Sequence, residues 1–179
     1  MKILVLYGSR YGCTEDCAKY LQNRINAAGH ESIISDIKNL QAVSKEGKTS
    51  EADLACFDWV IIGGSIYVGK IRKEVKCFCE QNLQELLAKK IALFICCTTP
   101  EEVNDYFKNN FPLQLLAHAF KTVNFGGELR QNKMGFFDKK LTALIFKLEP
   151  KKIEVFYKNI DQLADQINAF SDTPLGIVN

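Results

Sequence analysis

An α/β fold, with a doubly wound five-stranded parallel sheet and helices on both faces, is predicted by three features of the sequence. Short apolar runs recur along the chain, as expected for strands buried on both faces of a sheet. Segments with apolar residues at helical spacing separate these runs, and glycine or proline marks most of the boundaries. Strands that alternate with helices favour parallel pairing through right-handed crossovers. The chain contains no internal repeat and no obvious linker, so residues 1–179 are predicted to form a single domain.

The individual elements follow from these patterns. Strands are expected at residues 3–7, 32–35, 59–62, 91–97 and 121–125. Helices are expected at residues 14–28, 70–88, 100–120 and 160–170. Pro112 must bend or divide the third helix, and Asn159 is a plausible cap for the last one. Residues 38–50 lack clear periodicity and are expected to form a loop with at most a short helix.

Composition excludes several classes of protein. A net charge of +2 does not indicate a nucleic-acid partner, and no apolar run is long enough for a membrane span. The first residues do not resemble a signal peptide, so a cytoplasmic location is expected, with the inner face of the membrane as a further possibility. The seven cysteines form no C-x-x-C pair, which favours reduced, packed thiols over a disulfide framework or a zinc site.

The first strand runs into a loop with the composition of an anion cradle. Two hydroxyl donors and a glycine precede a helix, whose first N–H groups and positive dipole end point at the same place. A plain strand-to-helix turn, with Ser and Thr as caps and the arginine in solvent, is the alternative interpretation. Neither the P-loop motif nor the dinucleotide-binding glycine motif is present. The candidate residues are Ser9, Arg10, Tyr11, Gly12, Cys13 and Thr14.

This loop resembles the phosphate loop of the flavodoxins. The family pattern is [ST]-x-T-G-x-T directly after an N-terminal strand, and here Tyr11 replaces the middle threonine and removes one hydroxyl. The resemblance covers essentially the whole chain in element order. It implies a flavodoxin-like fold with FMN as cofactor.

Two further loops occupy the places where flavodoxins hold the flavin ring. The loop after the third strand supplies candidates Gly64, Ser65, Ile66, Tyr67, Val68 and Gly69. Its tyrosine suits stacking on the ring, although a surface aromatic at a loop tip is the alternative. The loop after the fourth strand supplies Cys97, Thr98 and Thr99. A cysteine at this strand end is more typical of packing than of redox chemistry.

Residues 128–152 depart from a minimal flavodoxin and are predicted to be a basic insertion, with residues 153–156 completing the fifth strand. Residues 137–148 carry an apolar stripe at helical spacing beside several lysines. Such a helix docks on the sheet with a solvated basic face, or lies on an anionic membrane surface. The sequences at 126–130, 137–139 and 145–147, and those at 64–66 and 67–69, resemble the quinone-dependent protoporphyrinogen oxidase branch of the family.

That branch implies a membrane-peripheral FMN enzyme that oxidises protoporphyrinogen IX and passes electrons to a quinone in haem synthesis. The partners would be an electron donor or a quinone- or porphyrin-type substrate. A diffusible electron carrier of flavodoxin type is the alternative, although such carriers are strongly acidic around the flavin. A cofactor-free binding module also remains open, whereas the acidic residues of a phosphoacceptor receiver are missing. No side-chain acid or base stands out, so no catalytic residue and no metal ligand is predicted.

Overall fold

Five parallel strands form one sheet in the part of the chain that this computed structural model describes, namely residues 1–40, 53–128, 130, 135 and 154–171. The strand order is β2-β1-β3-β5-β6, which is the doubly wound order in which the chain reverses direction beside β1. The strands are β1 (Lys2–Gly8), β2 (Glu31–Asp36), β3 (Trp59–Tyr67), β5 (Lys90–Cys96) and β6 (Lys121–Asn124). The predicted fold class is confirmed, with strand ends shifted by a few residues.

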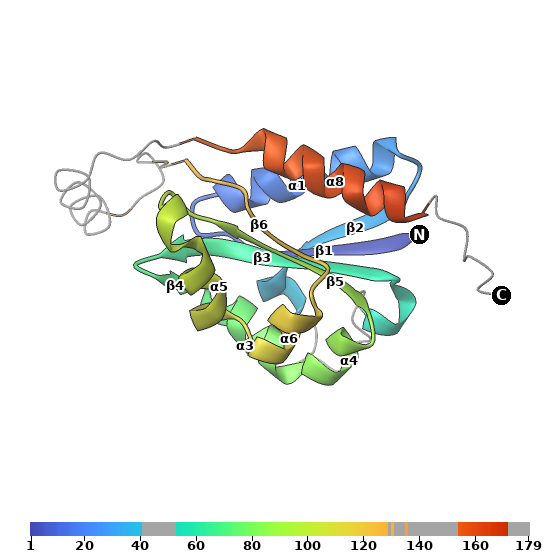
Figure 1. Cartoon of the computed structure of the whole chain (residues 1–179), viewed down its shortest axis with the longest axis horizontal. Coiled ribbons are helices and arrows are strands. Elements are labelled where there is room, and N and C mark those ends of the chain that lie inside the picture. Colours follow the sequence, from blue (N-terminus) through green and yellow to red (C-terminus); the bar gives the residue numbers. More distant parts are fainter. Residues whose placement is uncertain (41–52, 129, 131–134, 136–153, 172–179) are drawn as a thin grey trace.

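Helices cover both faces of this sheet (Figure 1). On one face lie α1 (Cys13–Ala27) and α8 (Tyr157–Ser171). On the other lie α3 (Lys73–Gln81), α4 (Leu83–Leu87), α5 (Val103–Asn110) and α6 (Leu113–His118). Two short 3-10 turns, Leu54–Cys56 and Pro100–Glu102, lie in the connections before β3 and before α5, and residues 37–40 after β2 are helical.

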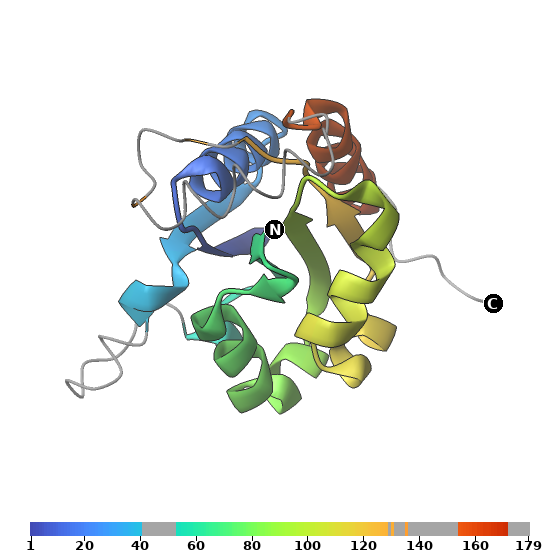
Figure 2. The ribbon, with the colours of Figure 1, turned by 90° about the vertical axis from the view of Figure 1, so that its left-hand side faces the viewer.

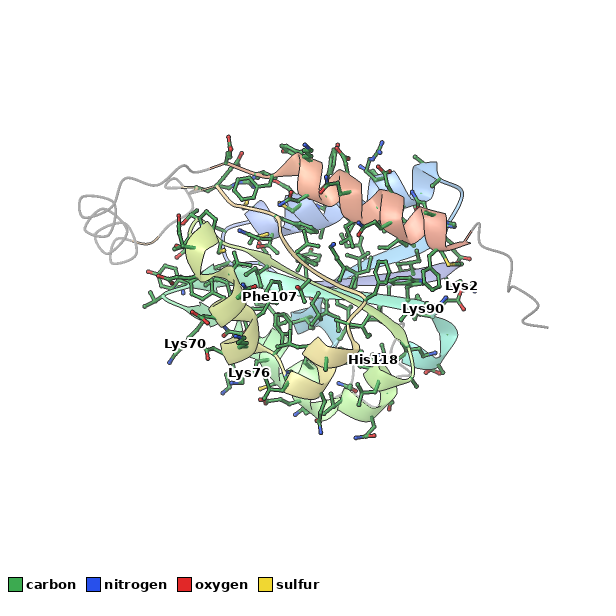
Figure 3. The ribbon with its side chains drawn as sticks, viewed as in Figure 1. Lys2, Lys70, Lys76, Lys90, Phe107 and His118 are labelled. Carbon is green, nitrogen blue, oxygen red and sulfur yellow. The ribbon has the colours of Figure 1, made fainter. Side chains whose placement is uncertain are left out.

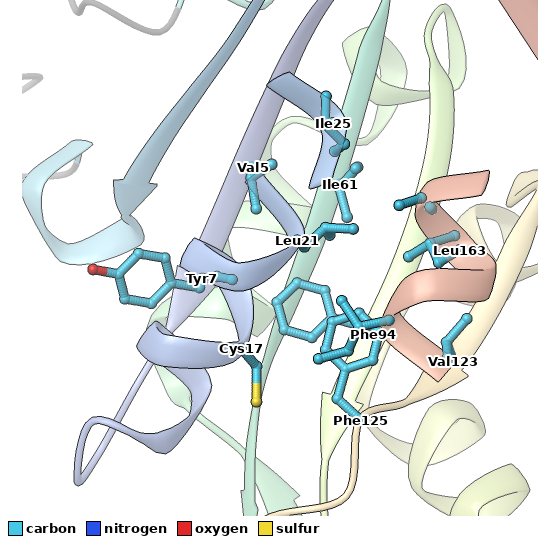
Figure 4. Packing of buried hydrophobic residues seen from close by; sticks show 14 of the residues in the cluster. Val5, Tyr7, Cys17, Leu21, Ile25, Ile61, Phe94, Val123, Phe125 and Leu163 are labelled. Atoms are coloured by element: carbon cyan, nitrogen blue, oxygen red, sulfur yellow. The ribbon is translucent and has the colours of Figure 1, made fainter. Parts of the chain in front are cut away.

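Each face of the sheet has its own hydrophobic core, because successive strand side chains point to opposite faces. Ile3, Val5 and Tyr7 pack under α1 and α8, whereas Leu4 and Leu6 pack under the helices of the other face. Figure 4 shows the first of these cores. In it, the ring of Phe94 stacks on Phe125 with ring centroids 4.6 Å apart.

The region predicted as one helix at residues 70–88 is divided into three elements. It begins with a short strand, β4 (Lys70–Ile71), which pairs antiparallel with the end of β3. Helices α3 and α4 follow and are separated at Asn82, whose backbone and side-chain N–H groups both donate to the carbonyl of Phe78. The predicted division at Pro112 is confirmed, since α5 ends at Asn110 and α6 starts at Leu113.

The end of the chain differs from the prediction in two ways. Helix α8 begins at Tyr157, so Asn159 lies inside the helix and its side chain donates to the backbone carbonyl of Asn124 at 2.8 Å. Residues 154–156 do not complete the fifth strand. Instead, Val155 forms an antiparallel bridge with Gly126. The predicted basic helix 137–148 and most of the insertion 128–152 lie outside the described residues.

Candidate functional site

The loops that follow β1, β3 and β5 meet at the carboxyl edge of the sheet. The parallel register places Gly8 beside Gly64 and Ser65 beside Cys96, so these three strands end side by side. Figure 2 views the molecule from this edge. A pocket of about 550 Å³, counting its open mouth, lies there and is called the three-loop pocket below. Its lining residues are Ser9, Arg10, Tyr11, Cys13, Thr14, Ser65, Ile66, Tyr67, Cys96, Cys97, Thr98, Gly127 and Glu128.

The first loop forms a tight turn into α1. Gly12 has a φ of 92°, a left-handed conformation that favours glycine, and its N–H donates to the hydroxyl of Ser9 at 3.0 Å. The N-cap residue of α1 is Gly12, which has no side chain to accept from the first N–H groups of the helix. The side chain of Thr14 is only 1% exposed, and its hydroxyl has no partner among the described residues. A buried, unpartnered hydroxyl beside free helix N–H positions is the arrangement that an anion would satisfy.

Arg10 lies between the first and second loops. Its guanidinium carbon is 4.1 Å from the centre of the Tyr67 ring and 5.4 Å from that of Tyr11. This contact is within the range of a cation–π interaction. The arginine therefore faces the site and covers one face of Tyr67.

The second loop is a hairpin that continues β3 as far as Tyr67 and returns through β4. Val68 at its tip has a φ of 49° and is 63% exposed. Buried Asn110 of α5 fixes the hairpin, because its side chain accepts from the N–H of Ile71 at 2.9 Å and donates to the carbonyl of Gly69 at 3.0 Å. Ser65, Ile66 and Tyr67 line the pocket. The other predicted residues of this loop, Gly64, Val68 and Gly69, do not.

The third loop is fixed by Asn124 at the end of β6. The side-chain amide oxygen of Asn124 accepts a hydrogen bond from the backbone N–H of Cys97 at 3.3 Å and another from the backbone N–H of Gly126 at 2.9 Å. Cys97 and Thr98 line the pocket, whereas Thr99 does not. Burial raises the pKa of the Cys97 thiol, so this cysteine is poorly suited to act as a nucleophile at neutral pH.

Three pocket residues were missed by the sequence interpretation: Cys96, Gly127 and Glu128. The N–H of Glu128 donates to the sulfur of Cys13 at 3.2 Å, which brings the segment after β6 against the start of α1. Arg130 extends this contact by pairing with Asp16 at 2.7 Å and with Glu128 at 3.2 Å. The glycine pair at 126–127 indicated a turn, but no pattern in the neighbouring sequence indicated that this turn lies against the first loop.

Three buried thiols, those of Cys13, Cys96 and Cys97, line the pocket. A hydrogen bond to Cys17, together with burial, raises the pKa of the Cys13 thiol. Cys13, Cys17 and Cys96 all belong to the core under α1. In the described ranges, no group of three or more His, Cys, Asp and Glu side chains is arranged to hold a metal ion. Nor is any helix of that part of the chain sufficiently long and apolar to cross a membrane.

The fold is shared with known proteins. The family model described as "Flavodoxin domain" matches residues 4–155. The chain is 22% identical to the protoporphyrinogen IX dehydrogenase [quinone] of Escherichia coli strain K12, and the match covers 97% of this chain and 98% of that protein. Among solved structures, an NADH:FMN oxidoreductase in its apo form matches with a TM-score of 0.62 and 16% identity, over 97% of this chain and 91% of that one. A flavodoxin from the domain Archaea matches with a TM-score of 0.54 and 14% identity, over 93% and 99%.

Proposed function

Because the chain belongs to the flavodoxin domain family, we propose that it is an FMN-dependent oxidoreductase that oxidises protoporphyrinogen IX and passes the electrons to a quinone. The flavin is supported by the family and by the three-loop pocket. The substrate is supported by the quinone-dependent dehydrogenase of Escherichia coli, which aligns along nearly its whole length.

The observation that carries the cofactor assignment is the buried hydroxyl of Thr14, which has no hydrogen-bond partner among the described residues. A buried polar group without a partner costs about 1 to 3 kcal/mol, so a ligand that accepts from it recovers that loss. An FMN phosphate is such a ligand. The hydroxyls of Ser9 and Thr14 and the first N–H groups of α1 would hold it, and the residues fit the group.

The other two loops would hold the flavin ring. Ile66 and Tyr67 offer an apolar and an aromatic surface, and the segment at Cys97 and Thr98 forms the facing wall. When bound, FMN supplies the redox chemistry, since none of these side chains is itself a two-electron carrier. Glu128 brings a carboxylate to the pocket edge, where Arg130 pairs with it.

The charge around the site favours an enzyme over a diffusible carrier. Four cationic side chains line a hollow next to the mouth of the three-loop pocket, namely Arg10, Lys70, Arg72 and Lys73. These cations attract anionic molecules, in contrast to the acidic surroundings of the flavin in electron-carrying flavodoxins. A carboxylate-bearing substrate such as a porphyrinogen is suited to such an edge.

The test has two stages. First, purified apoprotein is titrated with FMN, and flavin fluorescence and absorbance are recorded. We expect quenching and a one-to-one complex that releases FMN on acid treatment. Second, the FMN-loaded protein is assayed for oxidation of protoporphyrinogen in the presence of a quinone. Absence of turnover would overturn the reaction and leave the flavoprotein assignment, whereas absence of FMN binding would overturn both.

A further inference from the structure

A second hollow opens directly beside the three-loop pocket and is called the basic groove below. It measures about 1190 Å³, counting its open side. Its lining residues are Arg10, Ser65, Tyr67, Val68, Lys70, Ile71, Arg72, Lys73 and Glu74. Arg10, Ser65 and Tyr67 line both hollows, so the basic groove leads into the site proposed for the flavin.

Positive charge dominates this groove. Four cationic side chains line it against one carboxylate, that of Glu74. Arg72 pairs with Glu74 at 2.9 Å, and this contact holds the pKa of that carboxyl below its usual range. The charges of Arg72 and Glu74 therefore neutralise each other, and the excess positive charge of the groove comes from Arg10, Lys70 and Lys73.

Two lysines supply most of this excess. Lys70 and Lys73 are exposed, and neither forms an ion pair with a residue in the described ranges. Figure 3 shows Lys70, which belongs to β4, at one end of the sheet, with Lys2 and Lys90 at the other end. The ammonium groups of Lys70 and Lys73 are thus placed to bind an anion that approaches the three-loop pocket.

The wall of the groove is held in place. Asn110 fixes the β3–β4 hairpin through Ile71 and Gly69, and Arg72 donates to the backbone carbonyl of Ser9 at 3.3 Å. The apolar side chain of Val68 lies at the rim and is largely exposed. A fixed wall that combines cations with an apolar rim suits an organic anion better than an inorganic one.

We propose that the basic groove binds the organic reactant of this oxidoreductase, a molecule with at least two negative groups. Lys70 and Lys73 hold these groups while the reactive part reaches the three-loop pocket at Tyr67. This assignment rests on the FMN-dependent activity proposed above. The negative groups are carboxylates in a tetrapyrrole and phosphates in a pyridine dinucleotide, and both are recognised by the same ammonium chemistry.

Binding of redox-inert probes tests this assignment without turnover. Protoporphyrin IX and NAD⁺ are titrated separately into the full-length protein by calorimetry, with and without FMN and at two salt concentrations. We expect at least one probe to bind and to weaken as salt rises, because exposed charges are screened. The double variant Lys70→Glu/Lys73→Glu should bind that probe about tenfold more weakly, or about 1.4 kcal/mol, and should bind FMN as the wild type does.

The matched control is Lys76→Glu/Lys121→Glu. It carries the same change in net charge at exposed lysines that do not line the groove. Binding of only one probe identifies the carboxylate or the phosphate source, and either result supports the groove. Failure of both probes to bind the wild type, or an equal loss in the control, would overturn it. Probe binding by a protein that fails to bind FMN would instead overturn the proposed function and leave the groove as an anion site.

Discussion

The side chain of Asn124 accepts a hydrogen bond from the backbone N–H of Cys97, so the end of β6 is tied to the loop after β5. The same oxygen accepts from the N–H of Gly126, and Asn124 is only 9% exposed. One buried amide therefore shapes two of the segments that line the three-loop pocket.

Replacing Asn124 with alanine should leave two buried N–H groups without an acceptor. We expect a loss of about 2 to 4 kcal/mol in the free energy of unfolding, measured by urea denaturation. Asn124→Asp keeps an acceptor oxygen but loses the amide N–H that donates to the carbonyl of Cys97 at 3.5 Å and buries a charge, so it should recover only part of this loss. Asn109→Ala removes an exposed amide on α5 and serves as the control. Equal stability of the Asn124→Ala and Asn109→Ala variants would contradict the assigned role.

Thr14→Val should affect the apoprotein and the FMN complex in opposite directions. Removing a buried hydroxyl that has no partner should leave the stability of the apoprotein unchanged or slightly raised. FMN affinity should fall about tenfold, or about 1.4 kcal/mol, because a donor to the phosphate is lost. Thr14→Ser should restore affinity, and Thr122→Val offers the same chemical change at an exposed site. Wild-type FMN affinity in Thr14→Val would refute the phosphate contact.

Gly63→Ala should destabilise the sheet. A β-carbon at Gly63 would lie 2.3 Å from the carbonyl oxygen of Phe94 and 2.4 Å from its ring, far inside contact distance. We expect a loss of at least about 2 kcal/mol in the free energy of unfolding. At Gly127 the nearest atom to an added β-carbon is 3.7 Å away, on Thr98, so Gly127→Ala should change stability by less than about 0.5 kcal/mol. Thermal unfolding of both variants makes the comparison.

Thiol labelling should separate the cysteines by burial. Cys56 is exposed and Cys77 is half-buried, whereas the other five are buried. Native protein should therefore react quickly with Ellman's reagent at Cys56 and Cys77 only, and urea-unfolded protein should react at all seven positions. Fast labelling of Cys13 or Cys97 in the native protein would show that the floor of the pocket is open.

The stability of the folded protein should fall at alkaline pH, because burial also raises the pKa of ionisable side chains in the core. Burial raises the pKa of Cys79 from 9.0 to about 12, and so favours the protonated thiol in the folded state. The stabilisation is complete below pH 9.0, where the unfolded chain is also protonated, and it is lost as the pH rises toward about 12. Tyr7, whose pKa burial raises to about 12, acts in the same direction. Cys79→Ala should therefore lose stability less steeply over this range in denaturation curves.

The sequence predicted elements that local signals define. Gly12 and Thr14 after a buried strand indicated the first loop, and Pro112 indicated the division between α5 and α6. Strand β4 was missed because two residues carry no period of their own, and the strand is defined by the pairing of Ile66 with Ile71 and of Tyr67 with Lys70. The break at Asn82 was missed because neither glycine nor proline marks it. Glu128 reaches Cys13 across 115 positions of sequence, so no local pattern could place it in the pocket.

The two hollows are built from the chain in different ways. The three-loop pocket draws its walls from segments spread between Ser9 and Glu128, whereas all but one of the residues lining the basic groove fall within residues 65–74. The groove residues within 68–74 do not line the three-loop pocket, so under the proposal above their exchange would change which reactant is admitted while the residues proposed to hold FMN stay as they are. The proposed choice of reactant would then depend on one short segment of the chain, which can vary or be engineered without changing the phosphate loop.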